Sequence, residues 1–125
     1  TSTGREIVVH TDDVRAIQLA KAALYAGAKL LMRQYGLQQV DRIVLAGAFG
    51  TYLDKDAAQA IGLLPRAPHA RIAALGNAAG EGAALVVANR NAYREAKRLA
   101  GIIEHIELGT NPRFMQVFAD SMLLA

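Results

Sequence analysis

The sequence of 125 residues contains no cysteine and no tryptophan, and it has only three prolines. Without cysteine the chain forms no disulfide, and it offers no thiolate to a structural zinc ion or to an iron–sulfur cluster. Any redox cofactor that works with this chain must therefore be held elsewhere. A chain of this length fits one domain and can bury a core, although it hides only about two-thirds of the surface that it exposes when unfolded.

Long uninterrupted apolar runs are also missing. The longest apolar stretch, residues 72–88, is interrupted by Asn77, by three glycines and by Glu81. It is too short and too broken to span a bilayer. The start of the sequence shows no signal-peptide pattern either. We therefore expect a soluble, cytoplasmic domain with no membrane partner.

The charge is weakly positive and spread out. The sequence contains fourteen lysines and arginines and eleven acidic residues, which gives a formal net charge of +3. A nucleic-acid footprint would need these cations gathered on one surface. The nearest approach to a cluster is Arg90, Arg94, Lys97 and Arg98, whose spacing favours the solvated face of one helix over a phosphate-binding stripe. We expect no nucleic-acid partner.

Metal binding has little support in the sequence. His10, His69 and His105 lie far apart and show no ligand spacing. Asp54 and Asp56 could hold magnesium, but a helix cap and first-turn charge explain them more simply. No metal ligand and no catalytic residue is predicted in this chain.

The N-terminal part is expected to begin with a frayed segment or a truncation point at residues 1–10, which includes a short strand at residues 6–10, and the domain proper covers residues 11–125. Thr11 and the two aspartates after it indicate a helix entry. Apolar residues then recur at three and four positions and predict one buried helix face, and Gly36 is a plausible left-handed stop. The residues of that predicted face are Val14, Ile17, Ala20, Leu24, Ala28 and Leu31.

The rest of the chain alternates between strand and helix patterns. Strands are predicted at residues 42–46 and 71–75, with a weaker one at 105–108. Helices are predicted at residues 54–61, at 79–99 with a break near 89–91, and at 112–122 after Pro112. This order predicts an α/β fold, with a mainly parallel sheet and helices on both faces. Ligands gather outside the carboxyl ends of the strands in such sheets.

Two glycine-rich turns follow the two stronger strands. The first is Gly47-Ala48-Phe49-Gly50, and the second runs from Gly76 and Asn77 to Gly80 and Gly82. Glycine permits positive φ and lets a ligand approach where a Cβ atom would collide, and amides at a helix start favour anions. The pair could therefore form the wall of a nucleotide pocket, or it could simply allow tight turns and close packing. Spacing alone leaves these two interpretations equally supported, because neither turn is a Walker or Rossmann motif.

Aromatic residues beside the first turn leave a second choice open. Phe49 and Tyr52 could stack on a base or fill the core, and Phe49 between its glycines favours the core.

Four ordered blocks of the sequence resemble a known family. They are "VRAIQLAKAALYAG", "IVLAGAFGTYLD", "IGLLP" and "GNAAGEGAAL". Together they are similar to the C-terminal end of the ATP-dependent reductive activators of corrinoid proteins. The ATPase domain of these activators is of the acetate and sugar kinase, heat-shock chaperone and actin superfamily. The resemblance runs from about Val8 to Leu124 and implies the C-terminal lobe of an actin-like ATPase fold.

The resemblance also implies site residues. Gly47, Ala48, Phe49 and Gly50 stand where the family has its adenosine motif, with Ala48 in place of the usual second adjacent glycine. Gly76, Asn77 and Gly80 would lie nearby. The phosphate loops and the acidic residue that holds magnesium belong to preceding segments, so this chain alone is not expected to hydrolyse ATP.

The resemblance implies the role and partners of a parent protein. Such a parent binds ATP with Mg, carries a 2Fe-2S cluster in another domain, and returns inactive cobalt(II) corrinoid to cobalt(I) for methyl transfer. The expected partners are a corrinoid protein and the preceding domains of the same parent chain, with a homodimer left open.

Two other functions stay open at this point. The chain could be a non-catalytic interaction or dimerisation module that buries Leu30, Leu31 and the helix at residues 114–124 against a partner. It could also be a lobe of a sugar or acyl kinase, because a fold does not fix a function.

Overall fold

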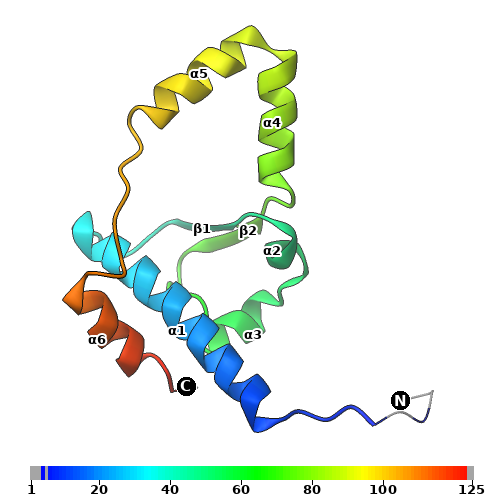
Figure 1. Cartoon of the computed structure of the whole chain (residues 1–125), viewed down its shortest axis with the longest axis vertical. Helices are drawn as coiled ribbons and strands as arrows, with labels where there is room; N and C mark the ends of the chain where they lie inside the picture. The colour runs from blue at the N-terminus through cyan, green and yellow to red at the C-terminus, as the bar shows by residue number, and fades with distance from the viewer. Residues whose placement is uncertain (1–3, 5, 124–125) are drawn as a thin grey trace. The chain divides into compact units, whose positions relative to one another are not determined.

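The computed structural model describes residue 4 and residues 6–123, with the side chain of Phe49 outside that description. Helices and strands alternate along it (Figure 1). In chain order the elements are α1 (Thr11–Gln34), β1 (Arg42–Leu45), α2 (Ala48–Tyr52), α3 (Lys55–Ala60), β2 (Arg71–Ala74), α4 (Ala78–Ala88), α5 (Arg90–Ala100) and α6 (Pro112–Asp120).

The elements form two compact units. The first holds residues up to Gln38, Asp56–Arg66 and the chain from Leu108 onward; the second holds Gln39–Lys55 and Ala67–Glu107. Each unit therefore packs mainly within itself, and each one combines segments that are distant in the sequence.

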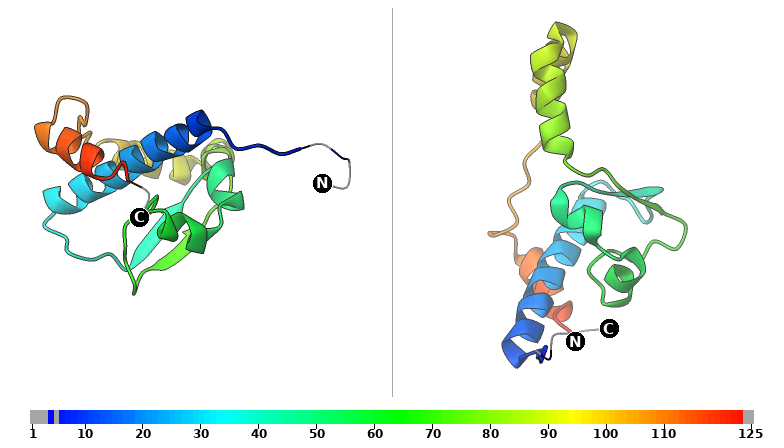
Figure 2. Two further views of the ribbon diagram at one scale, coloured as in Figure 1. Left: turned by 90° about the horizontal axis from the view of Figure 1, so that it is seen from below. Right: turned by 90° about the vertical axis from the view of Figure 1, so that its right-hand side faces the viewer.

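The first unit is built on α1 with α6 alongside it (Figures 1 and 2). Residue His10 caps α1, and its backbone N–H donates to the Asp13 carboxylate at 2.8 Å, which forms a capping box. At the other end Gly36 has φ +65°, as expected of a left-handed stop. Both ends of α1 thus follow the local sequence.

The buried face of α1 differs from the predicted one. Ala22, Ala26 and Leu30 are buried, whereas Ile17, Leu24 and Leu31 are exposed. The predicted face carries more of the larger apolar side chains, whereas the buried face combines the small residues Ala22, Ala26 and Gly27 with Lys21 and Leu30. A Cβ atom on Gly27 would already lie 3.4 Å from Leu108 Cδ1. The predicted stripe was therefore wrong.

The second unit contains a two-stranded parallel sheet. Arg42 pairs with Arg71 and Leu45 pairs with Ala74. One further hydrogen bond at the carboxyl end, from Leu75 N–H to the Leu45 carbonyl at 2.8 Å, extends the ladder. The parallel pairing of strands with helices between them confirms the predicted α/β class. Helices were expected on both faces of the sheet, but Val44 in β1 is 48% exposed.

A helix break at Asn89 separates α4 from α5, as predicted. Asn89 has an extended backbone, with φ −138° and ψ 115°. Its side-chain oxygen accepts from Asn91 N–H at 2.8 Å and from Ala92 N–H at 3.3 Å. The same residue thus ends one helix and caps the next.

On the exposed face of α5 a bidentate hydrogen-bonded ion pair joins Arg98 to Glu95, with the two N···O distances 2.6 and 2.9 Å. The Arg98 hydrogen bond lowers the pKa of Glu95, and the same bond raises the pKa of Arg98. The predicted solvated face of this helix is therefore present.

Two of the weaker strand predictions were wrong. Residues 6–10 and 105–108 have no strand structure. Their apolar residues have β propensity, but no strand of the described chain pairs with them, and an unpaired segment gains no ladder hydrogen bonds. The split of residues 1–10 from the rest of the chain stays a prediction, since residues 1–3 and 5 lie outside the described part.

Within the described residues, no helix is both long enough and apolar enough to cross a membrane.

Candidate functional site

The candidate site lies where β1 and β2 end. The two glycine turns after these strands are joined by a hydrogen bond of 2.7 Å, in which Gly47 N–H donates to the Gly76 carbonyl. Parallel strands end at the same edge of a sheet, which explains why turns almost thirty residues apart become neighbours. The predicted meeting of the two turns at one sheet edge is therefore present.

Each of these two glycines has a backbone conformation that a residue with a side chain would adopt only with strain. Gly47 has φ +99° and Gly76 has φ +61°. A Cβ atom on Gly47 would meet nothing within 4 Å, so open space lies over that backbone. The Gly47 N–H group is already used by Gly76. A ligand at this turn would therefore gain from close approach to the backbone and not from this amide.

Thr51 lies between the turns. Its hydroxyl group donates to the Gly47 carbonyl at 3.3 Å, and its Oγ1 atom lies 4.0 Å from the position of a Cβ on Gly76. Thr51 thus supports the first turn from the next turn of α2. Thr51 was not predicted as a site residue, although a hydroxyl residue four positions after a strand-ending glycine was the available signal.

Close packing against Leu45 explains why position 50 is a glycine. It is buried, and an added Cβ would lie 2.7 Å from Leu45 Cβ and 3.3 Å from the Leu45 carbonyl carbon. Gly50 therefore lets α2 lie close against the end of β1. Its contact with a ligand stays a prediction.

Gly80 serves the cap of α4. The Asn77 side-chain oxygen accepts from Gly80 N–H at 3.1 Å, and an added Cβ on Gly80 would lie 2.4 Å from Asn77 Nδ2. The absence of a side chain at Gly80 lets Asn77 fold back over the helix start. For these two residues as well, a role in ligand binding stays a prediction.

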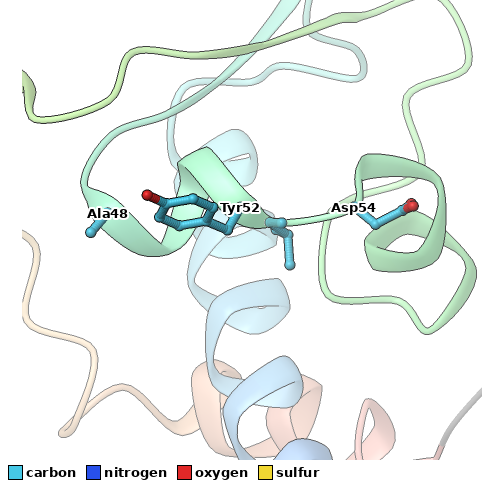
Figure 3. A pocket seen from close by; sticks show the side chains of 4 residues that line it. Ala48, Tyr52 and Asp54 are labelled. Carbon is cyan, nitrogen blue, oxygen red and sulfur yellow. The ribbon is translucent and has the colours of Figure 1, made fainter. Parts of the chain in front are cut away.

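A hollow of about 350 Å³ opens beside α2. Ala48, Tyr52, Leu53 and Asp54 line it, so of the predicted site residues whose side chains the structure describes, only Ala48 belongs to its wall. Figure 3 shows the Tyr52 ring lying across α2 with its hydroxyl group toward Ala48, while Asp54 points away from the ring. Tyr52 is 89% exposed, which is unusual for a large aromatic residue.

The hollow has the chemistry of a base-binding surface. The exposed face of Tyr52 offers an aromatic platform, and Ala48 and Leu53 add apolar surface. Of the two aromatic residues considered, Tyr52 is therefore available for stacking, whereas the side chain of Phe49 lies outside the described residues.

Metal ligands do not gather in the described residues: no group of three or more His, Asp or Glu side chains there comes close enough to share an ion. The chain has no cysteine to bind an iron–sulfur cluster.

Comparisons with known proteins cover all or nearly all of the chain. Residues 1–125 match the family described as the C-terminal domain of RACo, the ASKHA domain. The corrinoid activation enzyme RamQ of Eubacterium limosum is 42% identical over 117 residues, which cover 92% of this chain and 20% of that protein.

A solved structure supports the same assignment. The reductive activator for corrinoid, iron–sulfur protein superposes with a TM-score of 0.87 at 31% identity, over 98% of this chain and 20% of the other. The chain thus spans about a fifth of the length of both relatives.

Proposed function

This chain belongs to the family of C-terminal ASKHA domains of RACo, and on that premise we propose that it supplies the adenosine wall of an ATP-dependent corrinoid activator. One observation carries the proposal: two glycine turns, joined through Gly47 and Gly76, lie at the carboxyl ends of parallel strands. The hollow of about 350 Å³ beside α2 is at the small end of ligand pockets, which range from about 300 to 1,000 Å³. It suits a nucleoside better than a whole nucleotide.

We assign the base to the hollow and the sugar to the first turn. The adenine ring stacks on Tyr52 and contacts Ala48, while the ribose lies over the open backbone of Gly47. Stacking of a base on an aromatic side chain is worth about 1–3 kcal/mol. Tyr52 is therefore expected to contribute much of the base affinity.

The phosphates of ATP are assigned to other segments of a longer protein. Catalysis of phosphoryl transfer depends on positioning and charge neutralisation around the phosphates and magnesium. The described residues that line the hollow include one carboxylate, Asp54, and no cation. This chain by itself is expected to bind nucleotide weakly and not to hydrolyse it.

In the longer protein, ATP binding and hydrolysis would drive an unfavourable electron transfer. One electron would pass from a 2Fe-2S cluster to cobalt(II) corrinoid and yield cobalt(I). Because this chain has no cysteine, we assign that cluster to another part of the longer protein. Both similar proteins are named for corrinoid activation, which supports this reaction.

The stacking assignment is tested by Tyr52→Ala in the full-length protein, with ADP affinity measured by calorimetry. A loss of about 1–3 kcal/mol corresponds to a weakening of roughly 5- to 150-fold. Tyr93→Ala on α5 is the matched control, because Tyr93 is also exposed and lies outside the hollow. Equal ADP affinity in the Tyr52 variant and in this control would remove Tyr52 from the base site.

The activation reaction is tested with ATP and a reduced iron–sulfur donor, by following the visible spectrum of a cobalt(II) corrinoid protein. The proposal expects cobalt(I) to form only when ATP is present. Formation of cobalt(I) at the same rate without ATP would contradict it.

The interaction-module alternative keeps part of its predicted surface. Leu30 is buried and α6 packs on α1 within the chain, but Leu31 is 45% exposed. Other apolar residues also remain exposed, among them Leu85 and Val87 on α4, which are 63% and 89% exposed. Covering of α4 by preceding domains or by a second copy is thus a second role compatible with nucleotide binding.

A further inference from the structure

Lys21 is the buried charged residue of the first unit. It lies in the middle of α1 and only 3% of its surface is exposed, and among the described residues it is the sole polar or charged one in the buried class. Burying an ammonium group is costly unless it is paired and hydrogen-bonded. A buried lysine in a domain with few buried residues therefore requires acceptors.

The described residues supply Lys21 with one acceptor. Its ammonium group donates to the carbonyl oxygen of Leu123, just beyond α6. The same nitrogen lies 3.3 Å from the position of a Cβ on Gly62, which has φ +75° and follows α3. An ammonium group has three donors, so the contact with Leu123 leaves capacity for further bonds.

A cavity of about 280 Å³, open to solvent on one side, has Lys21 in its wall. Its wall comes from α1, from the turn after α3 and from the end of α6, all within the first unit. The lining residues are Lys21, Tyr25, Gly62, Arg66, Asp120, Ser121 and Leu123. The cavity is larger than a water molecule needs, which is about 30 Å³, and it is large enough for a small ion with some of its water.

Charged groups of both signs line this cavity without forming ion pairs with one another. Lys21 and Arg66 contribute two cations and Asp120 contributes one carboxylate. Among the described residues, no ion pair joins Asp120 to Lys21 or to Arg66. The wall therefore carries one excess positive charge. The Asp120 carboxylate can accept hydrogen bonds, and the Lys21 and Arg66 side chains can donate them.

We propose that this cavity is a binding site for a phosphate-type oxyanion that keeps a proton. Anionic oxygens of the ligand bind Lys21 and Arg66 through charge-assisted hydrogen bonds, and its hydroxyl group donates to Asp120. A fully deprotonated anion would meet repulsion at Asp120. At neutral pH inorganic phosphate keeps a proton and sulfate keeps none, so the site is expected to prefer phosphate.

This site is distinct from the proposed nucleotide site. Its wall comes from the first unit, whereas Ala48 and Tyr52 belong to the second. The inference does not depend on nucleotide binding, and failure of one leaves the other standing.

Inorganic phosphate is the probe, titrated by calorimetry into the full-length protein with ADP already saturating and with ionic strength held constant. Arg66→Gln is the main variant, because Arg66 is exposed and its loss leaves the core intact. We expect phosphate affinity to fall about tenfold or more, as for the loss of a hydrogen bond between charged groups. Lys21→Met is expected to abolish the binding.

Lys29→Met is the matched control. Lys29 lies two turns after Lys21 on the same helix and outside this cavity. It is expected to keep the phosphate affinity of the unchanged protein. The melting temperature of each variant, with and without phosphate, adds a second readout, since a ligand that binds the folded state raises it by an amount that grows with the logarithm of its affinity. A purely structural role of Lys21 would lower the melting temperature without changing this phosphate-dependent rise.

Asp120→Asn tests the preference for a protonated anion. An amide can donate to sulfate, so this variant is expected to bind phosphate and sulfate with similar affinity. Three results would overturn the proposal: no phosphate binding to the unchanged protein, equal binding in the Arg66 and Lys29 variants, or equal affinity of the unchanged protein for phosphate and sulfate.

Discussion

Replacing Gly50 with alanine isolates the contact that sets the distance between α2 and β1. The added Cβ would lie 2.7 Å from Leu45 Cβ, and two backbone atoms of Leu45 lie at 3.3 and 3.4 Å. Carbon atoms at optimal separation are about 3.5–4.0 Å apart. Backbone atoms cannot swing away as a side chain does, so α2 must move outward by about 1 Å.

The size of the effect follows from two opposing terms. Overpacking in a filled site costs about 1–3 kcal/mol. Alanine in a helix gains about 1 kcal/mol over glycine. Gly50→Ala is thus expected to change the free energy of unfolding by between about zero and 2 kcal/mol in the destabilising direction.

Gly82→Ala separates these two terms. Gly82 lies in α4, where an added Cβ would meet nothing within 4 Å, so only the gain in helix propensity applies. The difference in unfolding free energy between the two variants therefore reports the clash alone, about 1–3 kcal/mol. Urea unfolding measures it, and amide hydrogen exchange in β1 and α2 locates it. Equal stability of the two variants would refute the packing explanation of Gly50.

Further predictions concern the caps and the exposed ion pair. Asn77→Ala is expected to lower the free energy of unfolding by about 1 kcal/mol, measured by thermal unfolding. Gly80→Ala should stabilise the protein only when Asn77 is already alanine, because the Cβ atom of Ala at position 80 displaces the Asn77 cap. Additive effects of the two substitutions would argue against this coupling. The pKa of Glu95 is lowered in the folded state, so its contribution to stability is present above the ordinary carboxyl pKa and is lost as pH falls through the lowered value. An NMR titration should show this shift, and Arg98→Met should abolish it; an unchanged midpoint in that variant would contradict the assigned cause.

Local signals predicted much of the fold. Both ends of α1, the two parallel strands, the break at Asn89 and the start of α6 at Pro112 follow from caps, turn residues and apolar runs. These features depend on residues that are close together in the sequence, so they can be predicted from the sequence.

Features set by distant contacts were not predicted. The buried face of α1 depends on α6, and periodicity alone favoured the face with larger side chains. The short helix α2 was also missed, since its five residues include Gly50, which disfavours a helix on propensity.

In the candidate site, too, some features could be predicted from the sequence and others could not. Gly47 and Gly76 could be placed together from the sequence, because strand ends of a parallel sheet meet. The exposure of Tyr52 and the burial of Lys21 could not be foreseen, since both depend on which surfaces other segments cover.

The most direct test of the nucleotide proposal is a calorimetric titration of ADP into the full-length protein and its Ala48→Phe variant. Ala48 is exposed at the wall of the hollow, so the larger ring is expected to fill the base site without disturbing the core. We predict that the unchanged protein binds ADP and that the variant, at unchanged melting temperature, binds it at least about tenfold more weakly. Equal ADP affinity in the two proteins would contradict the assignment of adenine to this hollow.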